Sequence, residues 1–211
     1  HAGQPLQALI LFLPGVFEPD FCRHLIELHE ADGGRDTGFM NDVAGKTVEV
    51  LDAARKRRRD HIVEDESVIL PVQRRIKRRI VPEIARLFFF DATRIERYLV
   101  GCYTEEDGGH FAAHRDNTTR GTAHRRFAVS INLNDDFEGS EVSFPEYGPR
   151  GFKPPVGGAV VFSCSLMHAV SAVSRGRRYA FLPFLYDDAA ARIRAANNRF
   201  LDPSVGTYKG G

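Results

Sequence analysis

Two histidines and an aspartate have the residue types and spacing that best suit metal chemistry in this chain. His114 and Asp116 are two residues apart, and side chains two apart on a β-strand project from the same face. Arg115 between them then faces away. A third ligand must come from elsewhere, and His168, at the start of the strand-like segment HAVSAV, is the best candidate. Two histidines and one carboxylate leave metal positions open, which suits a ferrous ion that binds a co-substrate and dioxygen.

An arginine pair lies nine and ten residues after His168, at the start of another strand-like segment. Residues 174–176 predict a hairpin turn, and the next strand begins with Arg177 and Arg178. Because side chains alternate along a strand, only one of the two can face the metal cavity. A guanidinium binds a carboxylate through two parallel hydrogen bonds, as the far end of a dicarboxylate co-substrate would require.

Short strand-like segments must position these residues. They are separated by glycine turns, and the clearest, at 126–134, alternates large apolar with smaller residues. Many short strands with glycine turns are typical of a sandwich or jelly roll. The predicted strands cover residues 94–103, 110–116, 126–134, 141–145, 158–164, 167–173 and 178–186.

The first ninety residues have a more helical pattern. Residues 9–13 predict a buried strand, and apolar residues recur at helical spacing over about 18–30 and 67–87. Pro82 should kink or divide the second helix, and a last helix is predicted over 188–197. The predicted class is α+β, mainly β: a double-stranded β-helix (jelly roll) braced by N-terminal helices. One domain spans 1–211, with supporting elements in 1–90, the core in 91–188 and a C-terminal helix and tail in 189–211.

Composition narrows the class of protein. The 211 residues carry a formal net charge of +1, so no global field indicates nucleic acid or a membrane surface. No apolar run approaches the roughly 20 residues of a membrane span. The three cysteines, Cys22, Cys102 and Cys164, are widely spaced. They predict buried thiols without disulfides, a reducing compartment and a cytoplasmic location.

With these residues assembled, the chain resembles the 2-oxoglutarate- and Fe(II)-dependent dioxygenases, in their prolyl 4-hydroxylase-like branch. The resemblance runs from about residue 97 to residue 188. It rests on Cys102-Tyr103, the glycines at 108–109, HRDN at 114–117, INLND at 131–135 and GRRYAFLPFLYDD at 176–188.

The resemblance implies a role for each matching residue. Arg178 would bind the distal carboxylate of 2-oxoglutarate, and Tyr103 would hydrogen-bond the same co-substrate. Asn132 stands where close relatives carry a tyrosine that contacts that carboxylate. The catalytic iron would be held by His114, Asp116 and His168.

The reaction that the resemblance implies is hydroxylation coupled to decarboxylation of 2-oxoglutarate, which yields succinate and CO2. It requires Fe(II), 2-oxoglutarate and dioxygen, with ascorbate as a further candidate cofactor. Related halogenases lack the carboxylate ligand, so Asp116 favours hydroxylation. The predicted substrate is a prolyl residue of a peptide or protein, and the alternative is a free amino acid or another small molecule.

Two interpretations from other classes stay open. A non-catalytic cupin-like module would bind metal through the same triad, but a metal site alone does not need Arg178. The basic run at 55–59 raises the possibility of a nucleic-acid binder. The balanced charge of the whole chain and the acidic residues at 64–66 favour a solvated loop instead, so no nucleic-acid partner is expected. A smaller hypothesis assigns Arg57–Arg59 to an acidic or peptide substrate.

The remaining histidines and several phenylalanines are interpreted structurally. The two glycines before His110 argue against a zinc-binding helix there, and His110 is expected at the cavity rim or surface. His124 lies in a polar stretch and is expected to be exposed. Apolar core positions are expected for Phe144, Phe162 and Phe181.

Overall fold

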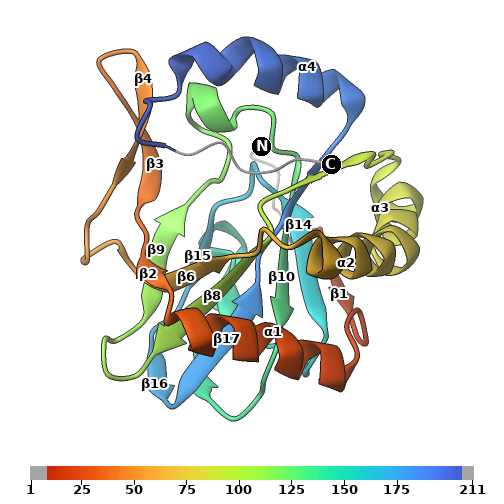
Figure 1. Ribbon diagram of the computed structural model, residues 1–211, viewed down its shortest axis with the longest axis vertical. Coiled ribbons are helices and arrows are strands. Elements are labelled where there is room, and N and C mark those ends of the chain that lie inside the picture. The colour runs from red at the N-terminus through yellow and green to blue at the C-terminus, as the bar shows by residue number, and fades with distance from the viewer. Residues whose placement is uncertain (1–8, 206–211) are drawn as a thin grey trace, which may run out of the picture.

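Two antiparallel β-sheets form the centre of the molecule in this computed structural model, which describes residues 9–205. Figure 1 shows the strands at the centre with the helices around them. The larger sheet has nine strands. Its main path is β1 (Ile10–Leu13), β14 (Ala159–Ser163), β10 (Phe127–Asn132), β17 (Arg177–Phe181), β8 (Leu99–Thr104), β6 (Arg59–Ile62) and β2 (Arg35–Asp36), and β18 (Phe184–Tyr186) and β7 (Arg94–Glu96) extend it from β10.

The smaller sheet has five strands and carries two of the three candidate metal ligands. Its order is β13 (Gly151–Phe152), β12 (Val142–Ser143), β15 (His168–Val170), β9 (His110–His114) and β5 (Lys56–Arg57). Two further pairs are formed by β3 (Phe39–Val43) with β4 (Lys46–Val50) and by β11 (Glu138–Gly139) with β16 (Val173–Arg175). Residues 35–62 therefore contribute strands to both main sheets.

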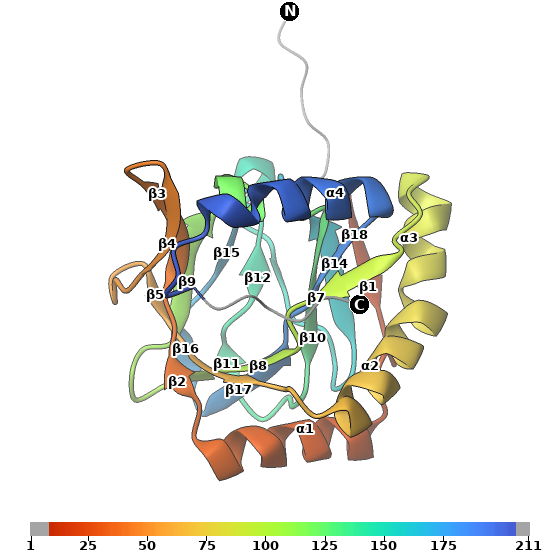
Figure 2. The same ribbon diagram turned by 45° about the horizontal axis from the view of Figure 1, so that its top comes forward.

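The described residues form four α-helices, and Figures 1 and 2 show that they lie around the sheets. Helix α1 (Pro19–Asp32) lies at one end and α4 (Asp188–Asn197) at the other, while α2 (Glu66–Arg79) and α3 (Val81–Phe88) run along one side. Local chemistry sets their limits. The Asp65 carboxylate accepts a hydrogen bond from Ser67 N at the start of α2, and Gly33, with φ of 76°, ends α1.

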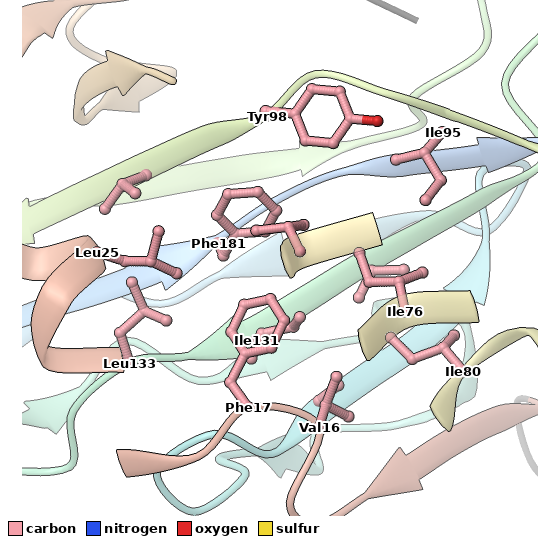
Figure 3. Packing of buried hydrophobic residues seen from close by; sticks show 14 of the residues in the cluster. Val16, Phe17, Leu25, Ile76, Ile80, Ile95, Tyr98, Ile131, Leu133 and Phe181 are labelled. Carbon is pink, nitrogen blue, oxygen red and sulfur yellow. The ribbon is translucent and has the colours of Figure 1, made fainter. Parts of the chain in front are cut away.

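The main hydrophobic core lies between the larger sheet and helices α1 to α3. Leu25 of α1 and Ile76 of α2 pack with Ile131 and Phe181 of the sheet, as Figure 3 shows. A second cluster joins strands of both sheets, among them β8, β10, β12 and β15. One face of the larger sheet thus supports the helices, and its other face meets the smaller sheet.

Several predictions from the sequence are confirmed. The first and last predicted helices correspond to α1 and α4, and the middle one is divided at Ile80, just before Pro82. Large apolar residues of β10 face the helices and smaller ones face the second sheet, as the alternation predicts. Buried positions are found for Phe144, Phe162 and Phe181 and for the free thiols of Cys22, Cys102 and Cys164.

Other predictions are wrong in detail. Strand β1 is not fully buried, because it is an edge strand and Phe12 is 47% exposed. The strand predicted over 94–103 is two strands, separated near Arg97, whose φ is 67°. Residues 174–176 do not form a hairpin, because β16 pairs with β11 rather than with β17. In the described part of the chain, no helix has the length and apolar character to cross a membrane.

Replacing Ile76 by alanine should lower the free energy of unfolding by about 2–5 kcal/mol, because Ile76 has no exposed surface and the substitution leaves a cavity. Urea unfolding measures the change. Arg78→Ala on the exposed face of the same helix is the control and should change the free energy by less than about 0.5 kcal/mol. Equal effects of the two substitutions would contradict the packing described here.

Candidate metal centre

The two candidate histidine ligands lie opposite each other on neighbouring strands. Antiparallel pairing of β9 with β15 places His114 directly across from His168, and their ring centroids are 4.2 Å apart. Asp116 lies in the turn after β9 rather than within the strand, and its backbone N donates to the carbonyl oxygen of Cys164 at 3.0 Å. The end of β14 therefore holds the carboxylate beside the two rings.

The donor atoms of these residues converge on one point. Each imidazole Nε2 lies 3.4 Å from an Asp116 carboxylate oxygen, and one donor atom from each residue lies within 4.8 Å of the others. Ligands with metal bonds of about 2.1 Å must lie roughly 3–4 Å apart. The Nδ1 atoms of His114 and His168 donate to the carbonyl oxygens of Ala112 and Leu166. This leaves the Nε2 lone pairs directed at the metal position, so the residues fit a single divalent ion.

The protonation states of the triad also suit a cation. Burial lowers the pKa of His168 to about 4, so its ring is neutral and can act as a ligand at neutral pH. Burial opposes ionisation of Asp116, but the neighbouring His168 and His114 reverse this effect and hold its pKa well below the usual range. Two imidazoles and one carboxylate are the ligand set of non-haem Fe(II) sites.

Arg178 of β17 is buried and has no acidic partner within residues 9–205. It is 1% exposed, and its Nε and Nη2 atoms donate to Asn132 Oδ1 at 2.9 Å and Ser130 Oγ at 2.7 Å. Its Nη1 atom has no hydrogen-bond partner, and it forms no ion pair within residues 9–205. Burial lowers the pKa of Arg178 to about 10. A buried guanidinium of this kind fits the carboxylate of a ligand.

The other predicted co-substrate residues surround this guanidinium. The ring of Tyr103 is 5.4 Å from the Arg178 guanidinium carbon, and its hydroxyl accepts a hydrogen bond from Arg58 at 3.3 Å. Asn132 orients Arg178 and also donates to the carbonyl oxygen of Pro154. Ser130 was not singled out from the sequence. It shares a strand face with Asn132, so the alternation of β10 could have identified it as a neighbour of Arg178.

The arginine next to Arg178 has a different environment. Arg177 is exposed and pairs with Glu106 at 3.2 Å. The prediction that only one of the two arginines faces inward is therefore confirmed.

The basic run at 55–59 is not a solvated loop, contrary to the prediction. It forms β5 and the start of β6, and alternate side chains are buried: Lys56 is 7% and Arg58 6% exposed. Arg58 donates from Nε and Nη2 to the two carboxylate oxygens of Asp60, at 2.5 and 2.7 Å. A β-carbon on Gly101 would lie 2.9 Å from Arg58 Cδ, so the glycine leaves space for this ion pair.

Two cavities meet at the triad. The outer cavity has a volume of about 340 Å³ and lies beside β3, β5 and β9. The inner cavity, of about 50 Å³, lies between the two sheets and is lined in part by Tyr103, Ser130 and His168. Both cavities are lined by Arg58, Arg97, Phe111, His114 and Asp116.

Two further histidines have structural contacts. His124 is 2% exposed, and its Nε2 pairs with the buried carboxylate of Glu96 at 2.8 Å, so the expected exposure is wrong. The partner lies 28 positions earlier in the chain, beyond any local pattern. His110 is half-buried beside residues 54 and 108, as expected for a rim position.

Asp60→Asn should destabilise the protein by about 3–5 kcal/mol near neutral pH, because it leaves Lys56 and Arg58 buried without a carboxylate. Burial opposes ionisation of Asp60, but Arg58 and Lys56 hold its folded-state pKa well below the usual range. Its stabilisation is therefore present above the ordinary aspartate pKa of about 3.9 and is lost as the pH falls further.

Chemical denaturation of wild type and variant at several pH values measures this difference. The exposed Asp36→Asn is the control. If Asp60→Asn lowers the free energy of unfolding only slightly and by the same amount at every pH, the result would contradict the buried ion pair.

Comparisons with known proteins agree with this geometry. Residues 95–186 match the model of a family described as the 2OG-Fe(II) oxygenase superfamily. A PKHD-type hydroxylase of Pseudomonas fluorescens is 28% identical over 185 residues, which cover 82% of this chain and 76% of the relative. The PKHD-type hydroxylase PiuC of Pseudomonas aeruginosa is 27% identical, with the same coverage of both chains.

Solved structures show a similar fold. A prolyl hydroxylase of Trichoplax adhaerens, in complex with a peptide fragment of the hypoxia inducible factor oxygen degradation domain, superposes with a TM-score of 0.66 at 17% identity. The match covers 89% of this chain and 86% of that one. A Pseudomonas putida prolyl-4-hydroxylase has a TM-score of 0.61 at 14% identity and covers 84% and 91%, respectively.

The sequence resemblance is therefore confirmed by the matching family model, by the PKHD-type relatives and by the fold. Fe(II), 2-oxoglutarate and dioxygen are the cofactor and co-substrates of this family. Residues 95–186 therefore match the 2OG-Fe(II) oxygenase superfamily, and this match together with the hydroxylase relatives supports oxidoreductase chemistry at the triad.

Proposed function

We propose that this protein is an Fe(II)- and 2-oxoglutarate-dependent dioxygenase that hydroxylates a prolyl residue of a peptide or protein. The observation that carries the proposal is the buried Arg178, which has no acidic partner within residues 9–205 and contacts Ser130 and Tyr103, two residues that line the inner cavity together with His114 and His168 of the convergent triad. A metal site alone has no use for a buried cation, whereas a site for a dicarboxylate co-substrate requires one. The prolyl assignment is supported by the prolyl hydroxylases and PKHD-type hydroxylases to which the chain is similar.

Each site residue has a proposed task. His114, Asp116 and His168 hold Fe(II), which when bound supplies dioxygen activation and couples substrate hydroxylation to formation of succinate and CO2. Arg178 binds the distal carboxylate, and Ser130 and Asn132 keep its guanidinium in place. The Tyr103 hydroxyl donates a hydrogen bond to the co-substrate while it accepts one from Arg58.

We further propose that the two main sheets are the two layers of a double-stranded β-helix within a single domain. Antiparallel pairing throughout both sheets and the shared apolar cluster between them support this proposal. The metal position then lies near the open end of the space between the layers, where the inner and outer cavities meet.

An anaerobic titration of the Fe(II)-loaded protein with 2-oxoglutarate tests the centre. A keto acid chelated to Fe(II) should produce a metal-to-ligand charge-transfer absorption band. His168→Ala should abolish the band by removing a ligand. Arg178→Ala should raise the concentration for half-maximal absorption at least about tenfold, because a charge-assisted contact is lost.

The exposed Arg177→Ala is the matched control for Arg178→Ala and should leave the titration unchanged. Iron binding without any absorption band in the wild-type protein would favour the non-catalytic cupin-like metal-binding module instead.

The substrate class is tested by mass spectrometry after incubation with Fe(II), 2-oxoglutarate and dioxygen. Proline-containing peptides should gain the mass of one oxygen atom, and peptides with alanine in place of proline should not. Modification of free amino acids or other small molecules alone would replace the prolyl proposal by the small-molecule alternative.

A further inference from the structure

The wall of the outer cavity next to β9 is cationic. We define the cationic wall as the side chains of Arg55, Lys56 and Arg58, all of which line the outer cavity. Arg57 and Arg59 alternate with Lys56 and Arg58, are exposed and line a surface groove that Lys56 and Arg58 also reach. Alternation along β5 and β6 therefore buries Lys56 and Arg58 and exposes Arg57 and Arg59, whereas Arg55 reaches the outer cavity from the turn before β5.

The cationic wall contains more positive charge than its own acid neutralises. Asp60 is the carboxylate that pairs with both Arg58, at 2.5 Å, and Lys56, at 3.6 Å. The Lys56 ammonium also donates to Thr37 Oγ1 and Gly38 O. Burial and the nearby Arg58 lower the pKa of Lys56 to about 7. When Lys56 is protonated, Asp60 is the one carboxylate that pairs with two buried cations, and this part of the cavity is short of negative charge.

Arg55 adds a cation with unused hydrogen-bond donors. It is exposed at the cavity mouth, and its guanidinium carbon lies 4.4 Å from the centre of the Phe39 ring. Among residues 9–205, no carboxylate pairs with this guanidinium and no acceptor receives a hydrogen bond from it. The contact with the Phe39 ring orients the planar guanidinium of Arg55 without using its N–H groups.

This wall is close to the triad. The Lys56 ammonium lies 5.4 Å from the centre of the Phe111 ring, and the same ring stacks on His114 with centroids 3.6 Å apart. A single aromatic ring thus separates the cationic wall from a proposed iron ligand. A molecule that binds the cationic wall through a small anionic group would therefore also reach the metal position.

Three other arginines line the outer cavity, and two of them pair with acids. Arg115 pairs with Glu146 at 2.7 Å, and Arg125 pairs with the buried Glu96 at 2.9 Å. The third, Arg97, donates to the carbonyl oxygen of Leu182 and lies over the Phe184 ring.

We propose that the cationic wall is a binding site for a carboxylate of the substrate, in which Arg55 makes the direct contact and Lys56 with Arg58 supplies the supporting charge. The proposal rests on the proposed function and specifies its substrate as acidic. In a peptide the carboxylate is a glutamate or aspartate side chain near the target proline. In a free amino acid it is the α-carboxylate.

The test measures binding without turnover. Two labelled peptides, identical except for glutamate or glutamine beside a central proline, are titrated with the full chain, Fe(II) and 2-oxoglutarate under anaerobic conditions. Fluorescence anisotropy follows binding. Free proline and prolinamide serve as competitors, so that a peptide carboxylate is distinguished from an amino-acid carboxylate.

The glutamate peptide should bind at least about tenfold more tightly than the glutamine peptide, as expected for a charge-assisted hydrogen bond. Arg55→Ala should abolish this difference. Arg59→Ala removes the same charge from the neighbouring outward-facing position and should preserve it. A second outcome would also support the proposal. If proline competes but prolinamide does not, and the two peptides bind equally, the carboxylate recognised at the wall is that of a free amino acid.

Equal binding of both peptides together with equal competition by proline and prolinamide would overturn the inference. So would a difference between the peptides that Arg55→Ala leaves intact. The absorption titration with 2-oxoglutarate is run on the same samples. A normal absorption band without carboxylate discrimination refutes this inference alone, whereas a missing band in the wild-type protein refutes the proposed function.

Discussion

Register between β9 and β15 is the constraint on which the candidate site depends. The two histidines lie opposite each other because these strands pair antiparallel at that position, and a slip of one residue would turn one ring to the other face of the sheet. The backbone carbonyls two residues before each histidine then bind Nδ1 and direct Nε2 inward. Asp116 completes the group because the end of β14 holds its backbone. Strand pairing, rather than any single contact, therefore organises the three donor residues.

Electrostatics divides the interior around Tyr103 into two different environments. Its ring lies near two buried guanidinium groups, those of Arg58 and Arg178. Asp60 neutralises the guanidinium of Arg58, and the two side chains form a buried ion pair at the cationic wall. Arg178 has only neutral hydrogen-bond partners. The protein thus neutralises one arginine itself and leaves the other without an acidic partner, which is what the proposed binding of a negatively charged co-substrate requires.

Local patterns were sufficient to predict much of this site. The start of a strand at His168 and the alternation around Arg178 are visible within short segments. The spacing of His114 and Asp116 identified the pair, but the predicted shared strand face is wrong, because Asp116 lies in the turn after β9. The strand period also predicted which face of β10 is apolar. By contrast, His124 was expected to be exposed because its partner Glu96 is distant in the sequence. Burial of charged residues depends on partners that only the tertiary fold brings together.

The alternation in residues 56–60 also predicts which mutations the chain can tolerate. Outward-facing Arg57 and Arg59 have surface contacts, so substitutions there resemble ordinary surface changes. An insertion or deletion of one residue would have a different outcome. It would exchange the two sets, place Arg57 and Arg59 against Gly101 and expose Asp60. Length variation between β5 and β6 should therefore be far rarer among related sequences than amino-acid variation at the outward positions.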